Sequence, residues 1–319
     1  MVVYVPMMFY IGKRFILKTS LANTFKRGTK LGWMPHRFKV KLAFRITDPF
    51  IRDADVTIAT AWYTAPFVNA LSKRKGSKVY FIQDYEVWNQ DENEVNATYR
   101  MDMYRIVITN NLKKLLKEKL GVDSTPVYNG HDSREYITCE KVKNNPKRVM
   151  MLWNNSWYKG TKEAVEILGR LHEKYGIRVI LFSVDKMSQI PPFVDFYQRP
   201  ERTKLIQLYQ ASDIYLFPSR QEAWGLPVME AMANKCAVVG MNTGMLADVC
   251  TNGIQALIAK NGDYETLEHF LETVLNDDLL MKQLQENGYQ FSLDYSWDKQ
   301  CKLFESELIK AVQSARKLT

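Results

Sequence analysis

Short apolar runs rich in β-branched residues alternate along the chain with stretches whose apolar residues recur at helical spacing. In one such stretch, Ala164, Leu168 and Leu171 fall on the same side of a helix. Strands separated by helices are typical of parallel sheets covered on both faces, so the pattern predicts the α/β class. The expected strands are Val2–Met7, Val56–Thr60, Lys78–Asp84, Arg105–Asn110, Pro126–Asn129, Arg148–Trp153, Arg178–Ser183, Val194–Tyr197, Ile214–Ser219, Ala237–Met241 and Ala256–Ala259.

The length of the chain predicts two domains. Its 319 residues exceed one ordinary core, and the polar stretch Glu140–Arg148 separates two similar α/β halves. Two such halves predict a cleft between the carboxyl ends of their strands. We expect an N-terminal Rossmann-like domain over residues 1–144, a C-terminal Rossmann-like domain over 145–294, and a C-terminal helix over 295–319 that crosses back to the first domain.

Basic residues concentrate near the N-terminus. Residues 1–50 contain ten Lys or Arg and a single acid, Asp48, so this segment carries the whole formal net charge of +9. A local positive field with interleaved aromatic residues suits an anionic membrane surface or an acceptor phosphate. A solvated basic face without a partner is the alternative. No nucleic-acid-binding motif accompanies the charge, so nucleic acid is not expected as a partner.

Cysteine and histidine positions predict no metal site. The four histidines are scattered, and the four cysteines lie far apart without C-x-x-C spacing, at Cys139, Cys236, Cys250 and Cys301. This cysteine usage is typical of a reducing cytoplasm. No apolar run reaches the ~20 residues that span a bilayer, and the N-terminus has no secretory leader pattern. We expect a cytoplasmic protein that can lie on the inner leaflet of the plasma membrane.

Candidate chemistry concentrates in Ser212–Gly244, whose sequence is SDIYLFPSRQEAWGLPVMEAMANKCAVVGMNTG. A buried strand runs into a turn that contains Glu222, and Gly225 and Pro227 then open a helix that carries Glu230. The amides and the dipole of that helix start predict an anion site that fits a diphosphate. Carboxylates beside it can accept hydrogen bonds from the vicinal hydroxyls of a nucleotide sugar. The alternative is that Glu222 only caps the helix and Glu230 is a solvated surface residue.

The E-x7-E spacing in PSRQEAWGLPVMEAMA resembles that of the retaining glycosyltransferases of the GT-B fold, family four, also called glycosyltransferase group 1. The likeness extends through TGMLADVCTNGIQALIAKNGDYETL and includes ASDIYLFPS, Lys159-Gly160 and Asn129-Gly130-His131-Asp132. It covers about residues 55–300. The resemblance implies two Rossmann-like domains that face each other across a cleft, and transfer of a sugar from a nucleotide-diphosphate donor.

The resemblance also implies roles for individual residues. Glu230 is expected to hold the nucleotide ribose, Glu222 the donor sugar, and Lys159 the charge of the leaving diphosphate. A plain surface lysine is the alternative for Lys159. In this family the departing phosphate is thought to take the acceptor proton, so neither a catalytic carboxylate pair nor a metal ion is expected. The other predicted donor contacts come from Asn154, Gly225, Leu226, Pro227, Val228, Gly244 and Met245.

The chain departs from the family pattern in three places. Trp153-Asn154-Asn155 stands where the family has an Arg shortly before its Lys-Gly, and Ala223 stands where the family has a Gly. Nothing before Val56 reads as the family's opening strand, Gly-rich loop and helix. We therefore expect an abbreviated N-terminal domain that lacks its first strand-loop-helix unit. The second phosphate-binding cation is expected from one of three arginines, Arg220, Arg199 or Arg202, with Arg220 assigned to the catalytic set. The alternative is that departure of the phosphate is less well stabilised.

The acceptor side is predicted from the first half of the chain. The peptide FIQDYEVWN follows an expected strand and resembles a segment of bacterial surface-polysaccharide glycosyltransferases, rhamnosyltransferases among them. Many family members have a His here, so Gln83 or Asp84 is expected to make its contacts. Tyr85 and Trp62 are expected to line the cleft, with simple packing as the alternative for Trp62.

These features predict a hexosyl- or deoxyhexosyltransferase of cell-surface polysaccharide synthesis. The donor is expected to be a UDP-, dTDP- or GDP-linked sugar, and the acceptor a saccharide or a lipid-linked saccharide. A non-catalytic GT-B-like subunit that binds the acceptor or a partner glycosyltransferase is the alternative, favoured by the missing Arg and the abbreviated first domain. A sugar-nucleotide epimerase is a third hypothesis, against which the E-x7-E pattern counts.

Overall fold

The computed structural model of the chain describes residues 1–6, 8–11, 14–17, 39–87, 90–136, 141 and 144–317. The chain divides into two units, one formed by Met1–Val127 with Phe304–Thr319 and the other by Tyr128–Leu303. Residues 128–144 thus group with the second unit, although their sequence was assigned to the first domain. One reason is that Lys141 donates hydrogen bonds to the carbonyl oxygens of Tyr209 and Asn234 in the second unit.

The second unit is built on a six-stranded parallel sheet with the order β11-β10-β9-β12-β13-β14. The order reverses between β9 and β12, because the chain first adds strands on one side of β9 and then on the other. Every strand that the apolar pattern predicts in this half is present, with ends that differ by at most two residues. The strands are β9 (Arg148–Leu152), β10 (Arg178–Ser183), β11 (Val194–Gln198), β12 (Ile214–Phe217), β13 (Ala237–Met241) and β14 (Ala256–Ala259).

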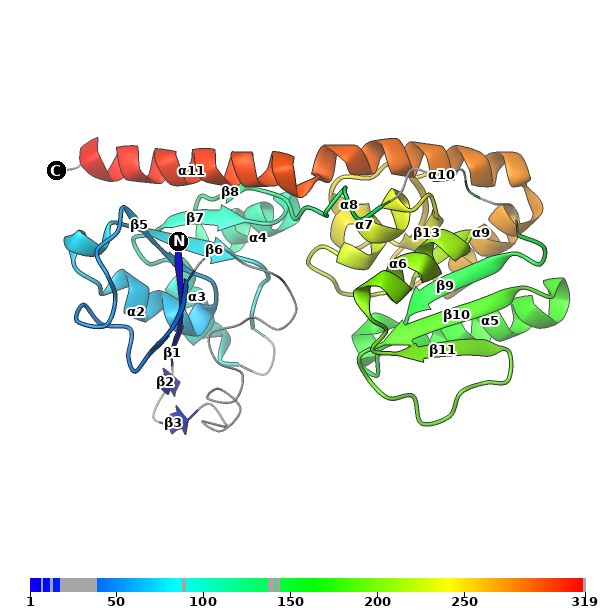
Figure 1. Cartoon of the computed structure of the whole chain (residues 1–319), viewed down its shortest axis with the longest axis horizontal. Helices are drawn as coiled ribbons and strands as arrows, with labels where there is room; N and C mark the ends of the chain where they lie inside the picture. Colours follow the sequence, from blue (N-terminus) through cyan, green and yellow to red (C-terminus); the bar gives the residue numbers. More distant parts are fainter. Residues whose placement is uncertain are drawn as a thin grey trace. The chain divides into compact units, whose positions relative to one another are not determined.

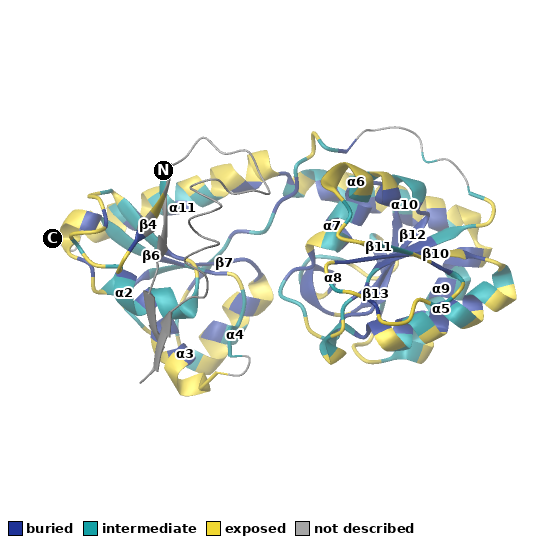
Figure 2. Ribbon diagram, turned by 60° about the horizontal axis from the view of Figure 1, so that its bottom comes forward, coloured by how far each residue is buried: buried dark blue, intermediate teal, exposed yellow. Residues whose placement is uncertain are grey.

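Helices cover both faces of this sheet. Figure 2 shows α5 and α9 on one face and α6 and α7 on the other, with the buried strands between them. The apolar stripe expected around Leu168 is buried in the core, together with apolar residues of α9 and of the strands. The helices are α5 (Thr161–Tyr175), α6 (Arg202–Ala211), α7 (Leu226–Ala233), α8 (Gly244–Asp248), α9 (Tyr264–Asn276) and α10 (Asp278–Ser292), with short 3₁₀ helices η3 (Trp157–Lys159) and η4 (Leu293–Tyr295).

The first unit has a four-stranded parallel sheet with the order β5-β6-β7-β8. The strands are β5 (Val56–Ala59), β6 (Ser77–Ile82), β7 (Tyr104–Val107) and β8 (Thr125–Pro126). Alternate residues of β6 point to opposite faces, as strand geometry requires. Tyr80 and Ile82 join the core formed with three helices, α2 (Ala65–Asn69), α3 (Glu92–Tyr99) and α4 (Asn110–Leu120). Two 3₁₀ helices, η1 (Trp62–Thr64) and η2 (Lys73–Lys75), complete this region.

The opposite face of that sheet is covered by α11 (Trp297–Lys317), the last helix of the chain (Figure 1). Its residues from Phe304 onward belong to the first unit. Val79 of β6 lies in a core with Ala311, and the ring of Phe304 packs edge-on against Phe81 with 5.0 Å between centroids. A helix from the C-terminal end of the chain therefore supplies one face of the N-terminal sheet.

The chain begins with two further strand pairs. β1 (Val2–Pro6) pairs in parallel with β4 (Lys39–Ala43), and β2 (Met8–Ile11) pairs in antiparallel with β3 (Arg14–Leu17). Only β1 was expected from the sequence. Residues 18–38 lie outside the described part of the chain, so the expected loss of the first strand-loop-helix unit stays a prediction. The same holds for membrane contact through residues 1–50, because residues 18–38 of that segment are not described.

We predict that Ala311→Asp destabilises the first unit. Ala311 is 3% exposed in an apolar contact, so an unpaired carboxylate there lowers the free energy of unfolding by at least ~2 kcal/mol. Gln313→Asp, at an exposed position of the same helix, is the matched control. Urea unfolding and proteolysis of the C-terminal helix measure the effect, and equal behaviour of the two variants would contradict this packing.

Candidate functional site

The carboxyl ends of β9 and β12 lie next to each other at the point where the strand order of the second unit reverses. The chain leaves β9 through Asn154 and η3 into α5, and leaves β12 through Glu222 into α7. In open parallel sheets the loops on the two sides of such a reversal diverge, and ligands bind in the crevice between them. This edge is therefore the candidate position for a ligand site in the second unit.

A small pocket occupies that edge. It brings together four of the residues that the sequence nominates for donor binding or catalysis: Asn154, Lys159, Glu222 and Pro227. Its remaining lining residues are Leu152, Thr161, Tyr215, Leu216, Phe217, Pro218 and Ser219. The pocket therefore has apolar walls formed by the ends of two strands, and its charged groups come from the two loops.

Lys159 and Glu222 form an ion pair inside this pocket. The Lys159 Nζ lies 2.5 Å from the Glu222 Oε2, and their side chains are 17% and 23% exposed. The next residue, Gly160, has φ +61° and lies against the loop after β12, where a Cβ would be 2.4 Å from the Pro218 carbonyl oxygen. Such a partly shielded pair holds a cation and an anion ready to exchange partners with a charged or hydroxyl-rich ligand.

Two more glycines shape the loop after β12. Gly225 has φ +94° and forms the N-cap of α7. Gly244 has φ +55°, and a Cβ there would lie 2.5 Å from the Trp224 carbonyl oxygen. Some of the predicted phosphate donors are engaged within the protein, since the amides of Val228 and Met245 donate to the carbonyl oxygens of Gly225 and Trp224. Gly225 and Leu226, at the start of α7, directly precede Pro227 of the pocket.

Glu230 lies one turn into α7 and does not line the small pocket among the described residues. Its Oε1 accepts a hydrogen bond from Nη1 of Arg202 at 2.6 Å. The same guanidinium donates to Glu135 Oε2 from Nε and Nη2, and to the Tyr136 hydroxyl at 2.8 Å. Burial alone would lower the pKa of Arg202, but its bonds to Glu135 and Glu230 outweigh burial and raise it. Sequence spacing gives no signal for this cluster, because Arg202 and Glu230 are far apart along the chain.

The other two candidate arginines face elsewhere. Arg220 pairs with Glu163 at 2.6 Å, donates to the Trp157 carbonyl oxygen at 2.8 Å and lies over the ring of Tyr264. Arg199 donates from Nε to the Val184 carbonyl oxygen. Among the three, Arg202 is the arginine that contacts a carboxylate expected to bind the donor.

The acceptor-side candidates cluster in the first unit, after β5 and β6. Tyr85 donates to Glu92 and Asn96, its amide binds the Asp84 carboxylate, and Gln83 reaches the Thr60 carbonyl oxygen at 3.4 Å. Glu86 of the same peptide accepts a hydrogen bond at its Oε2 from the Trp62 amide at 2.7 Å. Burial raises the pKa of Glu86, which makes it a candidate polar group at this sheet edge. Trp88 of the same peptide lies outside the described residues.

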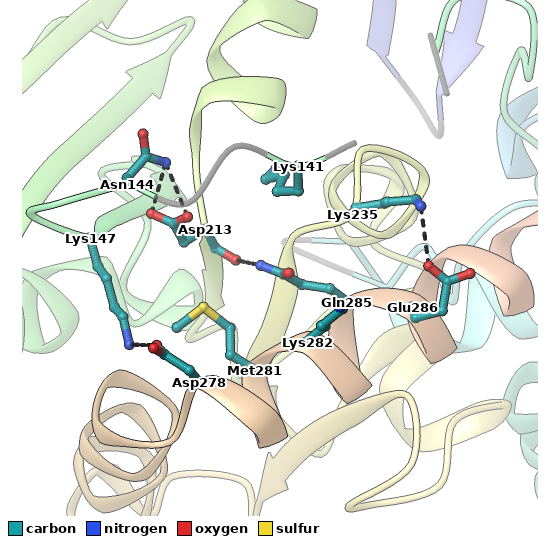
Figure 3. Close-up of a pocket in the computed structure, with 10 residues that line it drawn as sticks. All are labelled: Lys141, Asn144, Lys147, Asp213, Lys235, Asp278, Met281, Lys282, Gln285 and Glu286. Carbon is teal, nitrogen blue, oxygen red and sulfur yellow. Dashed lines mark hydrogen bonds and ion pairs between the residues drawn. The ribbon is translucent and has the colours of Figure 1, made fainter. Parts of the chain in front are cut away.

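Figure 3 shows a larger hollow of the second unit, a cavity of about 470 Å³. It shares no lining residue with the small pocket. Most of its charged groups satisfy one another, since Lys147 pairs with Asp278 and Lys235 with Glu286, and Asn144 donates to Asp213. These bonds hold the segment before β9 in place. The lining comprises Lys141, Asn144, Lys147, Asp213, Lys235, Asp278, Met281, Lys282, Gln285 and Glu286.

No group of three or more His, Cys, Asp or Glu side chains in the described part of the chain is arranged to hold a metal ion. Likewise, none of the described helices combines the length and the apolar character needed to cross a membrane.

Residues 133–291 match the family model described as glycosyl transferases group 1. This match covers 159 of the 319 residues and lies within the second unit. The matched segment includes both the small pocket and the Arg202–Glu230 pair. Assignment to family four, retention of configuration and the likeness to rhamnosyltransferases stay predictions.

Relatives of known sequence are also glycosyltransferases by name. An uncharacterized glycosyltransferase of Methanocaldococcus jannaschii is 33% identical over 82 residues, which is 26% of this chain and 23% of that protein. The N,N'-diacetylbacillosaminyl-diphospho-undecaprenol alpha-1,3-N-acetylgalactosaminyltransferase of Campylobacter jejuni is 22% identical over 263 residues, which is 75% of this chain and 69% of that protein. The match thus spans less than a quarter of the length of the Methanocaldococcus jannaschii relative. Together with the group 1 match, these names support a glycosyltransferase.

Solved structures with the same fold include sucrose-phosphate synthase from Thermosynechococcus elongatus, with a TM-score of 0.67 and 15% identity over 83% of this chain and 73% of that chain. Anabaena HepE in complex with UDP-glucose has a TM-score of 0.63 and 15% identity over 83% of this chain and 78% of that chain. The prediction of a GT-B fold, with two α/β domains on parallel sheets, is thereby confirmed.

We predict that Gly244→Ala distorts the loop that carries Glu222. A left-handed backbone alone costs an alanine ~1–2 kcal/mol, and at Gly244 the Cβ also meets the Trp224 carbonyl oxygen at 2.5 Å. Gly253→Ala is the control, because Gly253 has φ +80° but nothing within 4 Å of its Cβ position. Thermal unfolding of the two variants should show a clearly larger loss for Gly244→Ala; equal losses would mean that the close approach at Gly244 is absent.

Proposed function

We propose that the chain is a retaining glycosyltransferase that moves a sugar from a nucleotide-diphosphate donor to a saccharide or lipid-linked acceptor. The observation that carries the proposal is the Lys159–Glu222 pair in a pocket at the strand-order reversal of a group 1 domain. A lysine and a carboxylate at this edge match the two needs of such a donor. One group neutralises a leaving diphosphate, and the other accepts hydrogen bonds from sugar hydroxyls.

The donor's diphosphate would lie against the first turn of α7, where the helix dipole favours negative charge. On binding, Lys159 would exchange part of its contact with Glu222 for a phosphate oxygen. The carboxylate of Glu222 would then accept hydrogen bonds from the donor sugar. The apolar walls from Phe217 and Tyr215 exclude water and strengthen these charged contacts.

The proposed reaction needs no protein nucleophile. The bond between the anomeric carbon and the phosphate oxygen breaks, and its electron pair stays on the nucleoside diphosphate. The acceptor hydroxyl oxygen bonds to the anomeric carbon from the same face, and its proton passes to the departing phosphate. Lys159 stabilises the charge that develops on that phosphate, and no step uses a metal ion.

The comparisons support the class of donor and acceptor in this proposal. Anabaena HepE holds UDP-glucose in a structure of the same fold, and the Campylobacter jejuni relative is named for a diphospho-undecaprenol acceptor. We propose a UDP-, dTDP- or GDP-linked hexose or deoxyhexose as donor and a growing cell-surface glycan as acceptor. Gln83, Asp84, Tyr85 and Trp62 of the first unit are the proposed acceptor contacts. We further propose a cytoplasmic enzyme that meets the anionic inner leaflet of the plasma membrane through residues 1–50.

Donor binding can be tested before the acceptor is known. We predict that one nucleoside diphosphate from a panel of UDP, dTDP, GDP and their sugars raises the melting temperature of the wild-type chain, because a ligand that binds the folded state stabilises it. Lys159→Ala should weaken the binding of that nucleoside diphosphate by roughly tenfold or more, since it removes the cation of the pocket. Lys174→Ala, which removes the exposed partner of Glu272, is the control. If none of these nucleotides raises the melting temperature, the proposal is contradicted.

We predict that Glu222→Gln lowers the rate of sugar transfer by roughly 100-fold while the free nucleoside diphosphate still binds. Glutamine keeps the size of the side chain but loses the charge that pairs with Lys159 and orders the sugar hydroxyls. Release of nucleoside diphosphate, with a short-chain lipid-diphosphate saccharide as acceptor, measures the rate. Glu272→Gln should retain the wild-type rate.

The same variant separates the proposal from its alternative. A non-catalytic subunit that binds the acceptor or a partner glycosyltransferase is favoured by one observation, namely that Arg220 is engaged with Glu163 and the Trp157 carbonyl oxygen. If Glu222→Gln leaves the activity of the chain, or of a complex that contains it, unchanged, the subunit hypothesis is favoured over the transferase.

A further inference from the structure

Arg202 is held more firmly than an ordinary surface arginine. Its three guanidinium nitrogens all donate to neighbouring side chains of the second unit: Nη1 to Glu230 at 2.6 Å, Nε to Glu135 at 2.8 Å, and Nη2 to Glu135 at 2.6 Å. Nη2 also donates to the hydroxyl of Tyr136, whose side chain is buried. A planar guanidinium with all its nitrogens engaged has a fixed position and orientation.

The backbone on which Arg202 stands is fixed as well. Arg202 is the first residue of α6, three positions after Arg199, which has φ +48°. The Arg199 amide donates to the Ser183 carbonyl oxygen at 2.7 Å, and its Nε donates to the Val184 carbonyl oxygen at 3.1 Å. These bonds tie the β11–α6 connection to the carboxyl end of β10. Arg202 is therefore presented from the same sheet edge as the small pocket.

The arrangement determines how much of the Glu230 carboxylate is available. Glu230 is 16% exposed and Arg202 41% exposed, so the pair is only partly open to water. The Arg202 bond occupies one acceptor position of Oε1, and the buried Tyr209 hydroxyl interacts with the same carboxylate, so about two of its four acceptor positions are left. A carboxylate oxygen offers two lone pairs, and these match the two neighbouring hydroxyls of a ribose. Arg202 also offsets the negative charge of Glu230, which would otherwise repel a nearby diphosphate.

We propose that Arg202 is a positioning residue that fixes Glu230 for recognition of a ribose diol, so that the donor is a ribonucleotide and not a 2′-deoxyribonucleotide. The inference rests on the proposed function and narrows it, because it selects UDP- or GDP-linked sugars over dTDP-linked ones. A deoxyribose would leave one acceptor position of a shielded carboxylate unpaired, and such unmatched polar groups discriminate strongly between ligands.

The test compares UDP with 2′-deoxy-UDP and GDP with 2′-deoxy-GDP by titration calorimetry, with inorganic pyrophosphate as a ligand that lacks ribose. For the base that binds, the wild-type chain should prefer the ribonucleotide by at least about tenfold. Arg202→Ala should reduce this preference to about threefold or less. Pyrophosphate affinity falls as well, because Glu230 then carries an uncompensated charge, so the ratio of ribonucleotide to 2′-deoxyribonucleotide affinity is the readout. Arg202→Lys should restore part of the preference, since a lysine can still pair with Glu230.

A matched control is Arg170→Ala. It removes an exposed arginine of the same unit that donates hydrogen bonds to both carboxylate oxygens of Glu268. It should keep the wild-type preference. Melting temperatures of all variants show whether they fold. If Arg202→Ala does not fold, Glu135→Gln tests the same point, because it removes the charge that holds the guanidinium from the other side. It should lower the ribose preference about threefold without affecting pyrophosphate.

The outcomes distinguish this inference from the proposed function. If the wild-type chain binds no nucleotide, the proposed function fails. If it binds nucleotides and Glu230→Gln abolishes the ribose preference while folded Arg202→Ala and Glu135→Gln keep it, the role of Arg202 is overturned. A wild-type chain that binds the 2′-deoxy nucleotide as tightly as the ribonucleotide also overturns it, while leaving the diphosphate site intact.

Discussion

The reversal of strand order between β9 and β12 is the constraint on which the rest of the second unit depends. Because all six strands are parallel, their carboxyl ends lie along one edge. The reversal sends the loop after β9 and the loop after β12 in different directions, and the residues at their bases stay close to each other. Lys159 and Glu222 meet across this gap, although 63 positions separate them in the sequence.

Charge pairing organises the candidate site around this gap. Each carboxylate expected to contact the donor has one cation at hydrogen-bonding distance, Lys159 for Glu222 and Arg202 for Glu230. Paired carboxylates avoid the cost of a shielded, uncompensated charge. Each also keeps an oxygen that can accept hydrogen bonds from hydroxyl groups. The site is thus compatible with an anionic ligand that carries many hydroxyls, whereas unpaired acids at the same positions would repel it.

The sequence predicted the elements of the sheets well, because buried parallel strands leave continuous apolar runs. All strands expected from Val56 onward have a counterpart, although β8 shares only Pro126 with the expected Pro126–Asn129. Gly225 and Pro227 open a helix that carries Glu230, as expected. β4 was missed since Lys39 and Lys41 interrupt its apolar pattern. Contacts between distant segments were harder to predict. The ion pairs Arg220–Glu163 and Arg202–Glu135 join residues that are far apart in the sequence. The spacing of residues along the chain therefore could not predict them.

The last helix has a consequence for how the protein can be divided. The first unit consists of two separate stretches of the chain, and the second of these is the C-terminal part of α11. A fragment that ends at Val127 would lack Phe304 and Ala311 and would expose the apolar face of Val79 and Phe81 to water. An independently folding version of this unit would have to splice residues 304–317 back onto it through a designed connection. During synthesis, the packing of this sheet face must likewise wait until residues 304–317 have emerged from the ribosome.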